Sequence, residues 1–154
     1  MATVKPKTVV QYKITGESVS HSRTDIETRD VDVTIDEPLA RDGTNMGLAP
    51  TETLIAALIG CTNVIGQRVG EAHGVHFDDL RIDALADFDR RGVMMQEEVE
   101  VPFPKITLTI SGISDVDPAT LEKVKTDLGR FCPIAKVIRA AGTDIEEIWD
   151  ISKP

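Results

Sequence analysis

A long segment between Pro50 and Gly74 limits most strongly what this chain can fold into. Pro50 suits the first position of a helix, and Gly74 suits the position just after a helix ends. The stretch from Leu54 to Ile65 is apolar nearly all round a helix, and such a helix has to be buried over most of its surface. We therefore predict a helix over residues 50–73, at the centre of the molecule or of a dimer.

Small residues recur in this segment at Ala56, Gly60 and Gly70. A glycine inside a helix destabilises it by about 1 kcal/mol relative to alanine. Because this loss needs a compensating gain, we predict that the small residues allow close packing against another helix.

The other segments predict strands before and after this helix, and two further helices near the end of the chain. Alternation of apolar and polar residues, as at Val31, Val33 and Ile35, is typical of a half-buried strand. Because helices and strands are segregated rather than alternating, the predicted fold class is α+β with a mostly antiparallel sheet. The predicted strands cover residues 8–16, 19–27, 31–36, 75–88, 98–112 and 145–151, the further helices cover 117–131 and 134–141, and a long loop covers 36–49.

Length and composition predict a single domain over residues 1–154. The chain is 41% hydrophobic, which allows a core, and 28% charged, which favours solubility. No apolar run approaches the roughly 20 residues that a membrane span needs. Residues 1–7 lack the apolar stretch of a secretory signal. We therefore expect a cytoplasmic protein without a membrane partner.

The charge balance argues against binding to nucleic acids. Acidic residues outnumber basic ones by 26 to 17, which gives a net charge of -9. A nucleic-acid-binding protein needs a basic stripe that displaces counterions from phosphates, and the sequence has none. We attribute the acidic charge to solubility and expect no nucleic-acid partner.

Two cysteines, Cys61 and Cys132, are the candidate reactive groups. A structural disulfide is not expected in a reducing cytosol, and the long separation of the two residues fits no zinc motif. Cys132 precedes Pro133 at the start of a predicted helix, where free N–H groups and the helix dipole stabilise a thiolate. Cys61 lies about three turns inside its helix, so its activation requires a nearby cation. Two buried, inert thiols are the alternative interpretation.

The residues around both cysteines resemble the signature of the OsmC/Ohr family. That signature runs from two acidic residues and a proline, through a glycine-rich loop and Pro-x-Glu-x-Leu, to a small-residue helix and a cysteine. Residues 36–62 match it, from Asp36-Glu37-Pro38 to Cys61-Thr62, and Cys132-Pro133-Ile134 matches a second family motif. The predicted order of strands and helices also resembles the family from about residue 9 to residue 151.

This resemblance implies an intertwined homodimer in which sheets wrap two long central helices. It also implies a cysteine-based peroxidase, acting in oxidative stress, that reduces organic hydroperoxides or hydrogen peroxide without a cofactor or a metal. In such an enzyme a thiolate attacks the O–O bond and becomes a sulfenic acid, which condenses with a second thiol. An external dithiol then restores both thiols.

The resemblance also assigns roles to individual residues. Cys61 would be the peroxidatic cysteine and Cys132 the resolving one. Glu52 matches the glutamate that holds an activating arginine, for which Arg23 is the first choice and Arg29 the second.

Glu52 departs from the family pattern, which leaves alternatives open. It lies nine positions before Cys61, which puts the two residues on opposite faces of a regular helix. Glu52 therefore acts through a distorted helix or a partner subunit, or is only an acid in the first helical turn. The alternative function is a non-catalytic dimer that binds a hydrophobic ligand or a partner. His73 and His76 lack further metal ligands, so we expect surface histidines and no metal site.

Overall fold

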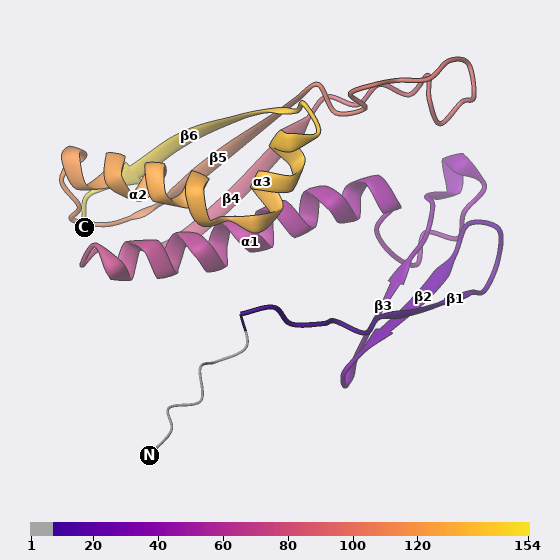
Figure 1. Cartoon of the computed structure of the whole chain (residues 1–154), viewed down its shortest axis with the longest axis horizontal. Coiled ribbons are helices and arrows are strands. Elements are labelled where there is room, and N and C mark those ends of the chain that lie inside the picture. The colour runs from indigo at the N-terminus through magenta and orange to yellow at the C-terminus, as the bar shows by residue number, and fades with distance from the viewer. Residues whose placement is uncertain (1–7) are drawn as a thin grey trace. The chain divides into compact units, whose positions relative to one another are not determined.

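A computed structural model of the chain describes residues 8–154 (Figure 1). The chain divides into two compact units, Met1–Thr53 and Leu54–Pro154. Helix α1, Pro50–Ala72, begins in the first unit and continues through the second. That residues 1–154 form a single domain stays a prediction.

The first unit contains a three-stranded antiparallel sheet in the order β1-β2-β3. The predicted meander is confirmed, but its first two strands begin later than predicted. Residues 8–14 are exposed and lie outside any strand, because β-forming residues adopt a strand only where another strand pairs with them. The strands are β1, Thr15–Ser18, β2, Thr24–Thr28, and β3, Val31–Ile35, and a short 3-10 helix, η1, covers Leu39–Arg41.

Asp36 organises the loop that leads into α1. Its fully buried carboxylate accepts hydrogen bonds from the Ser22 hydroxyl at 3.0 Å and the Met46 N–H at 3.1 Å. Thr44 donates twice, from its hydroxyl at 2.5 Å and its N–H at 3.1 Å. These bonds, the Thr44 hydroxyl first, outweigh burial and lower the pKa of Asp36 to about 2. The predicted long loop is therefore held by one ionised side chain.

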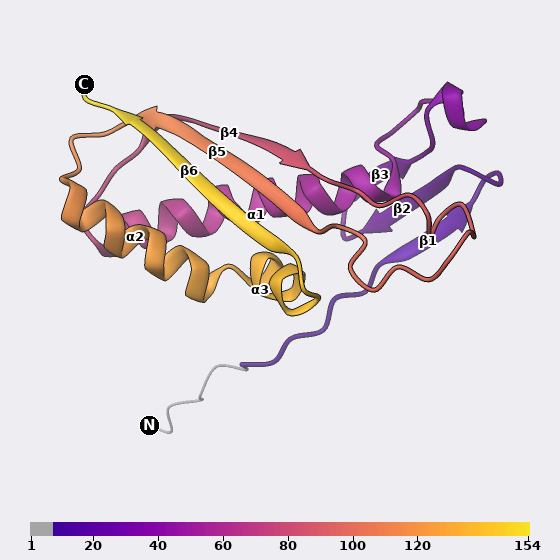
Figure 2. The same ribbon diagram turned by 90° about the horizontal axis from the view of Figure 1, so that it is seen from above.

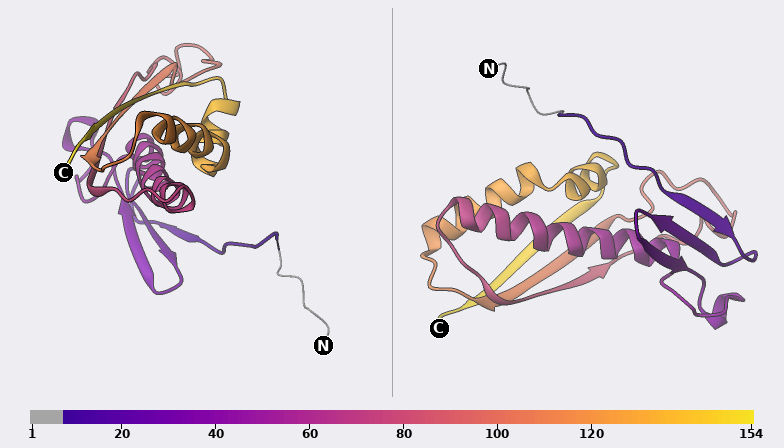
Figure 3. Two further views of the ribbon diagram at one scale, coloured as in Figure 1. Left: turned by 90° about the vertical axis from the view of Figure 1, so that its left-hand side faces the viewer. Right: turned by 90° about the horizontal axis from the view of Figure 1, so that it is seen from below.

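The second unit contains the sheet β4-β5-β6 and helices that cover one of its faces (Figures 2 and 3). β4, Asp78–Ala86, is antiparallel to β5, Lys105–Ile113, whereas β6, Asp144–Ser152, is parallel to β5. The connection from β5 to β6 contains α2, Pro118–Phe131, and α3, Pro133–Ala140. A helical crossover of this kind permits the parallel pair. The α+β class and the mostly antiparallel pairing are confirmed.

The core of the second unit lies between the sheet and the helices. Leu58 of α1 and Leu128 of α2 are buried there against the inward side chains of β5. Phe103 and Trp149 are partly buried against the same core. On the opposite side of α1, Val64 is 49% exposed. One chain therefore covers one face of α1, and burial at the centre of a dimer stays a prediction.

Among residues 8–154 the glycines of α1 pack against no other helix, so the predicted close helix packing is wrong within one chain. Packing against a helix of a second chain stays a prediction. A side chain added at Gly60 would meet no atom within 4 Å. At Gly70 an added Cβ would lie 3.0 Å from the Phe77 ring and 3.1 Å from the Val75 carbonyl oxygen. Gly70 thus allows the chain to fold back closely after α1 and enter β4.

Local sequence signals predicted most of the other helix and strand boundaries to within a few residues. Asp117 caps α2 by accepting a hydrogen bond from the Thr120 N–H at 3.0 Å, as its position before Pro118 predicts. β5 begins at Lys105 rather than at residue 98, because Pro102 and Pro104 cannot donate to a strand ladder. None of the helices over residues 8–154 combines the length and hydrophobicity that a bilayer-spanning segment requires.

Candidate functional site

Two sulfur atoms meet where α1 passes the junction of α2 and α3 (the helices are labelled in Figure 2). Cys61 lies on α1, and its Sγ is 3.1 Å from the Sγ of Cys132. Both residues are free thiols, although an S–S bond of about 2.0 Å would need only a small further approach. The prediction that two cysteines distant in sequence approach each other is confirmed.

Both flanking helices hold Cys132 in place. Its N–H donates to the Leu128 carbonyl of α2 at 2.9 Å, and its own carbonyl accepts from the Lys136 N–H of α3 at 3.1 Å. Its thiol accepts from the Ala135 N–H at 3.5 Å. Cys132 therefore ends α2 and caps the N-terminus of α3, as its position before Pro133 predicts.

Burial, however, decides the ionisation of Cys132. The residue is 1% exposed, and burial raises the pKa of its thiol to about 11. The Ala135 N–H lowers this pKa, but less than burial raises it, and the Cys61 sulfur raises it further. The expectation of a cap-stabilised thiolate at Cys132 is therefore wrong, because desolvation outweighs the helix N-terminus. At neutral pH Cys132 remains a thiol and donates its S–H to the half-buried Cys61.

Glu52 makes a local contact at the start of α1. Its Oε2 accepts a hydrogen bond from the Ala49 N–H at 2.8 Å, which satisfies a backbone donor at the helix N-terminus. No hydrogen bond or ion pair over residues 8–154 joins Glu52 to Arg23 or to Arg29. The contact favours the interpretation of Glu52 as a first-turn acid.

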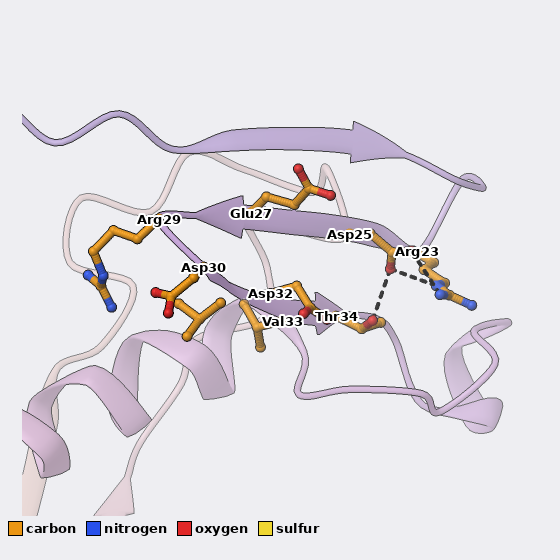
Figure 4. Close-up of a pocket in the computed structure, with 9 residues that line it drawn as sticks. Arg23, Asp25, Glu27, Arg29, Asp30, Asp32, Val33 and Thr34 are labelled. Carbon is orange, nitrogen blue, oxygen red and sulfur yellow. Dashed lines mark hydrogen bonds and ion pairs between the residues drawn. The ribbon is translucent and has the colours of Figure 1, made fainter.

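Arg23 is paired with a different carboxylate (Figure 4). Its Nε and Nη2 donate to the two oxygens of Asp25 at 2.9 and 2.8 Å, and Asp25 also accepts from the Thr34 hydroxyl at 2.9 Å. The Arg23 guanidinium, followed by Thr34, lowers the pKa of Asp25. Arg29 is exposed and has a left-handed backbone, with a φ of 56°. The role of either arginine as an activating cation stays a prediction.

Both arginines line a polar cavity of about 400 Å³ in the first unit (Figure 4). Its four carboxylates outnumber its two guanidinium groups, and no cysteine lines it. The lining residues are Arg23, Asp25, Glu27, Arg29, Asp30, Val31, Asp32, Val33 and Thr34.

His73 is half-buried rather than on the surface, contrary to expectation. Its Nε2 lies 2.9 Å from Asp127 Oδ2 of α2, and Arg130 donates to the other oxygen of Asp127 at 2.9 Å. His76 is exposed, as expected, 3.2 Å from Asp78. Within residues 8–154 no three His, Cys, Asp or Glu side chains are grouped to hold a metal ion.

A polar cluster that the sequence pattern did not predict joins α3 to β6. Glu147 accepts from Arg139 Nη2 of α3 at 3.0 Å and from Trp149 Nε1 at 3.3 Å. The Glu147 side chain is only 15% exposed. The available signal was the alternation along the predicted last strand, which places Glu147 on the same inward face as Ile145 and Trp149.

Comparison with known proteins adds a family-level match. A model of the family described as OsmC-like protein matches residues 43–147. The matched range contains Glu52, Cys61 and Cys132 but not Arg23 or Arg29. None of the curated protein sequences matches this chain.

Solved structures of several bacterial proteins have a similar fold. An OsmC-like protein from Mycoplasma pneumoniae has a TM-score of 0.73 at 13% identity, covering 94% of this chain and 97% of its own. The organic hydroperoxide resistance protein OsmC from Legionella pneumophila has a TM-score of 0.63 at 13% identity, covering 95% and 99%. The organic hydroperoxide resistance protein OhrB of Bacillus subtilis has a TM-score of 0.57 at 18% identity, covering 93% and 98%. At these identities the likeness is one of fold.

Proposed function

Since this chain belongs to the OsmC-like protein family, we propose that it is a thiol-dependent peroxidase that uses Cys61 and Cys132. The distance of 3.1 Å between the two sulfurs carries this proposal, because it places a resolving thiol beside a candidate nucleophile. Similar folds in organic hydroperoxide resistance proteins from two bacteria favour organic hydroperoxides as the substrate class.

In the first step the Cys61 thiolate attacks the terminal oxygen of a hydroperoxide. The O–O bond breaks, the sulfur gains the oxygen and becomes a sulfenic acid, and the alkoxide leaves as an alcohol after taking a proton. Cys61 suits this role better than Cys132, because it is the more accessible sulfur and burial keeps Cys132 protonated.

In the second step Cys132 attacks the sulfenic acid of Cys61. The S–S bond forms, the S–O bond breaks, and the hydroxyl leaves as water with the proton of the Cys132 thiol. The short distance between the sulfurs favours this step over further oxidation of Cys61 by a second peroxide. An external dithiol then reduces the disulfide and is itself oxidised.

The remaining assignments come from the family resemblance. They are a homodimer built on α1, a cytoplasmic location, and activation of Cys61 by Arg23 with help from Glu52. Arg23 would raise the thiolate fraction of Cys61 if its charge approached the sulfur. Arg23→Ala should then slow the first step more than Arg29→Ala does.

Steady-state kinetics with a dithiol donor test the proposal. Cumene hydroperoxide and hydrogen peroxide are supplied separately to the wild type, to Cys61→Ser and to Cys132→Ser. Cys61→Ser should reduce neither peroxide, because a serine hydroxyl does not ionise at neutral pH. Cys132→Ser should complete one turnover and then accumulate overoxidised Cys61.

The two variants serve as controls for each other, since each keeps one thiol. Equal rates for wild type and Cys61→Ser would refute the peroxidase and leave the ligand-binding or partner-binding dimer as the better hypothesis. A free Cys132 thiol after stoichiometric oxidation of Cys61 would refute the two-cysteine mechanism alone.

A further inference from the structure

The position of the Cys132 sulfur depends on helix α3. Cys132 caps the first turn of this helix through its thiol and its carbonyl. A displacement of α3 would therefore change the position of the sulfur relative to Cys61, because α3 is one of the two helices that hold Cys132.

Helix α3 is too short to be stable on its own. It has 8 residues, of which only Ala135 and Ile138 are buried. An isolated helix of fewer than about 12 residues is marginal in water, so tertiary contacts have to hold it.

The ion pair of Arg139 and Glu147 is a polar contact that holds α3 against β6. Arg139 Nη2 donates to Glu147 Oε1 at 3.0 Å, and Trp149 Nε1 donates to Glu147 Oε2 at 3.3 Å, so both carboxylate oxygens accept a hydrogen bond. Near Gly129 of α2 there is little spare room beside this guanidinium, since an added Cβ there would lie 3.8 Å from Nη1 of Arg139. The guanidinium thus joins α3 to β6. Because the Glu147 side chain is 15% exposed, this pair is screened less than the surface ion pairs of the chain.

We propose that Glu147 is a positioning residue that, through Arg139, keeps α3 where the Cys132 sulfur lies within reach of Cys61. The inference rests on the proposed peroxidase and concerns its second step. A misplacement of about 1 Å can slow a positioned reaction by roughly a hundredfold. Loss of the pair should therefore slow formation of the disulfide but leave the attack of Cys61 on the peroxide nearly unaffected.

Single-turnover kinetics on Glu147→Leu separate these two steps. Samples are quenched at intervals after one equivalent of cumene hydroperoxide, and mass spectrometry counts the sulfenic acid, the disulfide and the sulfinic acid. Formation of the sulfenic acid should stay within about twofold of the wild-type rate, whereas formation of the disulfide should fall by about tenfold or more. With excess peroxide the sulfinic acid should accumulate, because Cys61 waits longer for Cys132.

Three further variants keep the test specific. Glu146→Leu removes the neighbouring ion pair between Glu146 and Lys105. Lys105 Nζ lies 2.6 Å from Glu146 Oε2, and both side chains are about half-exposed on the outer face of the sheet. This variant should form the disulfide at the wild-type rate. Glu147→Gln keeps an oxygen that accepts from Arg139 and should recover much of the lost rate. Arg139→Met should reproduce the effect of Glu147→Leu, and it replaces that variant should Glu147→Leu fail to fold.

Disulfide closure by diamide provides a readout that does not depend on peroxidase activity. This azo oxidant couples the two thiols and is itself reduced to the hydrazine. Slower closure in Glu147→Leu than in Glu146→Leu would support the positioning role even if the wild type reduced no peroxide. Equal closure rates in the two variants, or an equal slowing of both steps with peroxide, would overturn it.

Discussion

Closing the bond between Cys61 and Cys132 should stabilise the fold by an amount that follows from the chain between them. The two residues are 71 positions apart in sequence, yet their sulfurs lie 3.1 Å apart. A disulfide that closes a loop of this length removes unfolded-state entropy worth about 4 kcal/mol at 25 °C. For a chain of this size that gain corresponds to a rise in Tm of roughly 10 °C or more.

Urea denaturation of the reduced and the oxidised protein measures this gain. Oxidation with diamide avoids any dependence on the peroxidase, and mass spectrometry under non-reducing conditions verifies that the bond lies within one chain. Cys132→Ser, treated in the same way, should show no gain. A difference in unfolding free energy below about 1 kcal/mol would refute the reasoning, because the closed bond would then distort the junction almost as much as it restrains the unfolded chain.

Three further predictions concern single residues. Leu58→Ala, at a position that is 0% exposed, should lower the unfolding free energy by about 2–5 kcal/mol, whereas Val137→Ala on the surface should change it by less than about 0.5 kcal/mol in the same urea titration. The depressed pKa of Asp36, about 2 against an ordinary value of 3.8, contributes stability that is present above the unfolded value and is lost as the pH falls toward 2. Asp36→Asn should therefore be less stable at neutral pH and show a weaker pH dependence of unfolding in that window; an unchanged dependence would contradict the assignment. In Cys61→Ser, alkylation of Cys132 by iodoacetamide should still rise well above pH 8.5, because burial is the main cause of its raised pKa; half-maximal reactivity near pH 8.5 would show that the thiol is solvated.

The sequence by itself determined the features that depend on a few adjacent residues. The bounds of α1 follow from Pro50 and Gly74, and the start of α2 follows from Asp117 before Pro118. The cap that Cys132 provides for α3 follows from its position before Pro133. Each of these signals concerns backbone groups within one helical turn, so no distant residue is needed to interpret it.

Only the tertiary structure decided the properties that depend on distant residues. The approach of Cys61 to Cys132 was expected from a family resemblance, since no local pattern links two helices so far apart in sequence. The raised pKa of Cys132 reverses the expectation from its helix position, because burial depends on residues that pack around the sulfur from other elements. The contact of Arg139 with Glu147 likewise joins two elements that are separate in sequence, since Arg139 lies on α3 and Glu147 lies on β6, which pairs with β5. Local chemistry therefore set where the helices begin and end, and long-range packing set which side chains meet and which of them ionise.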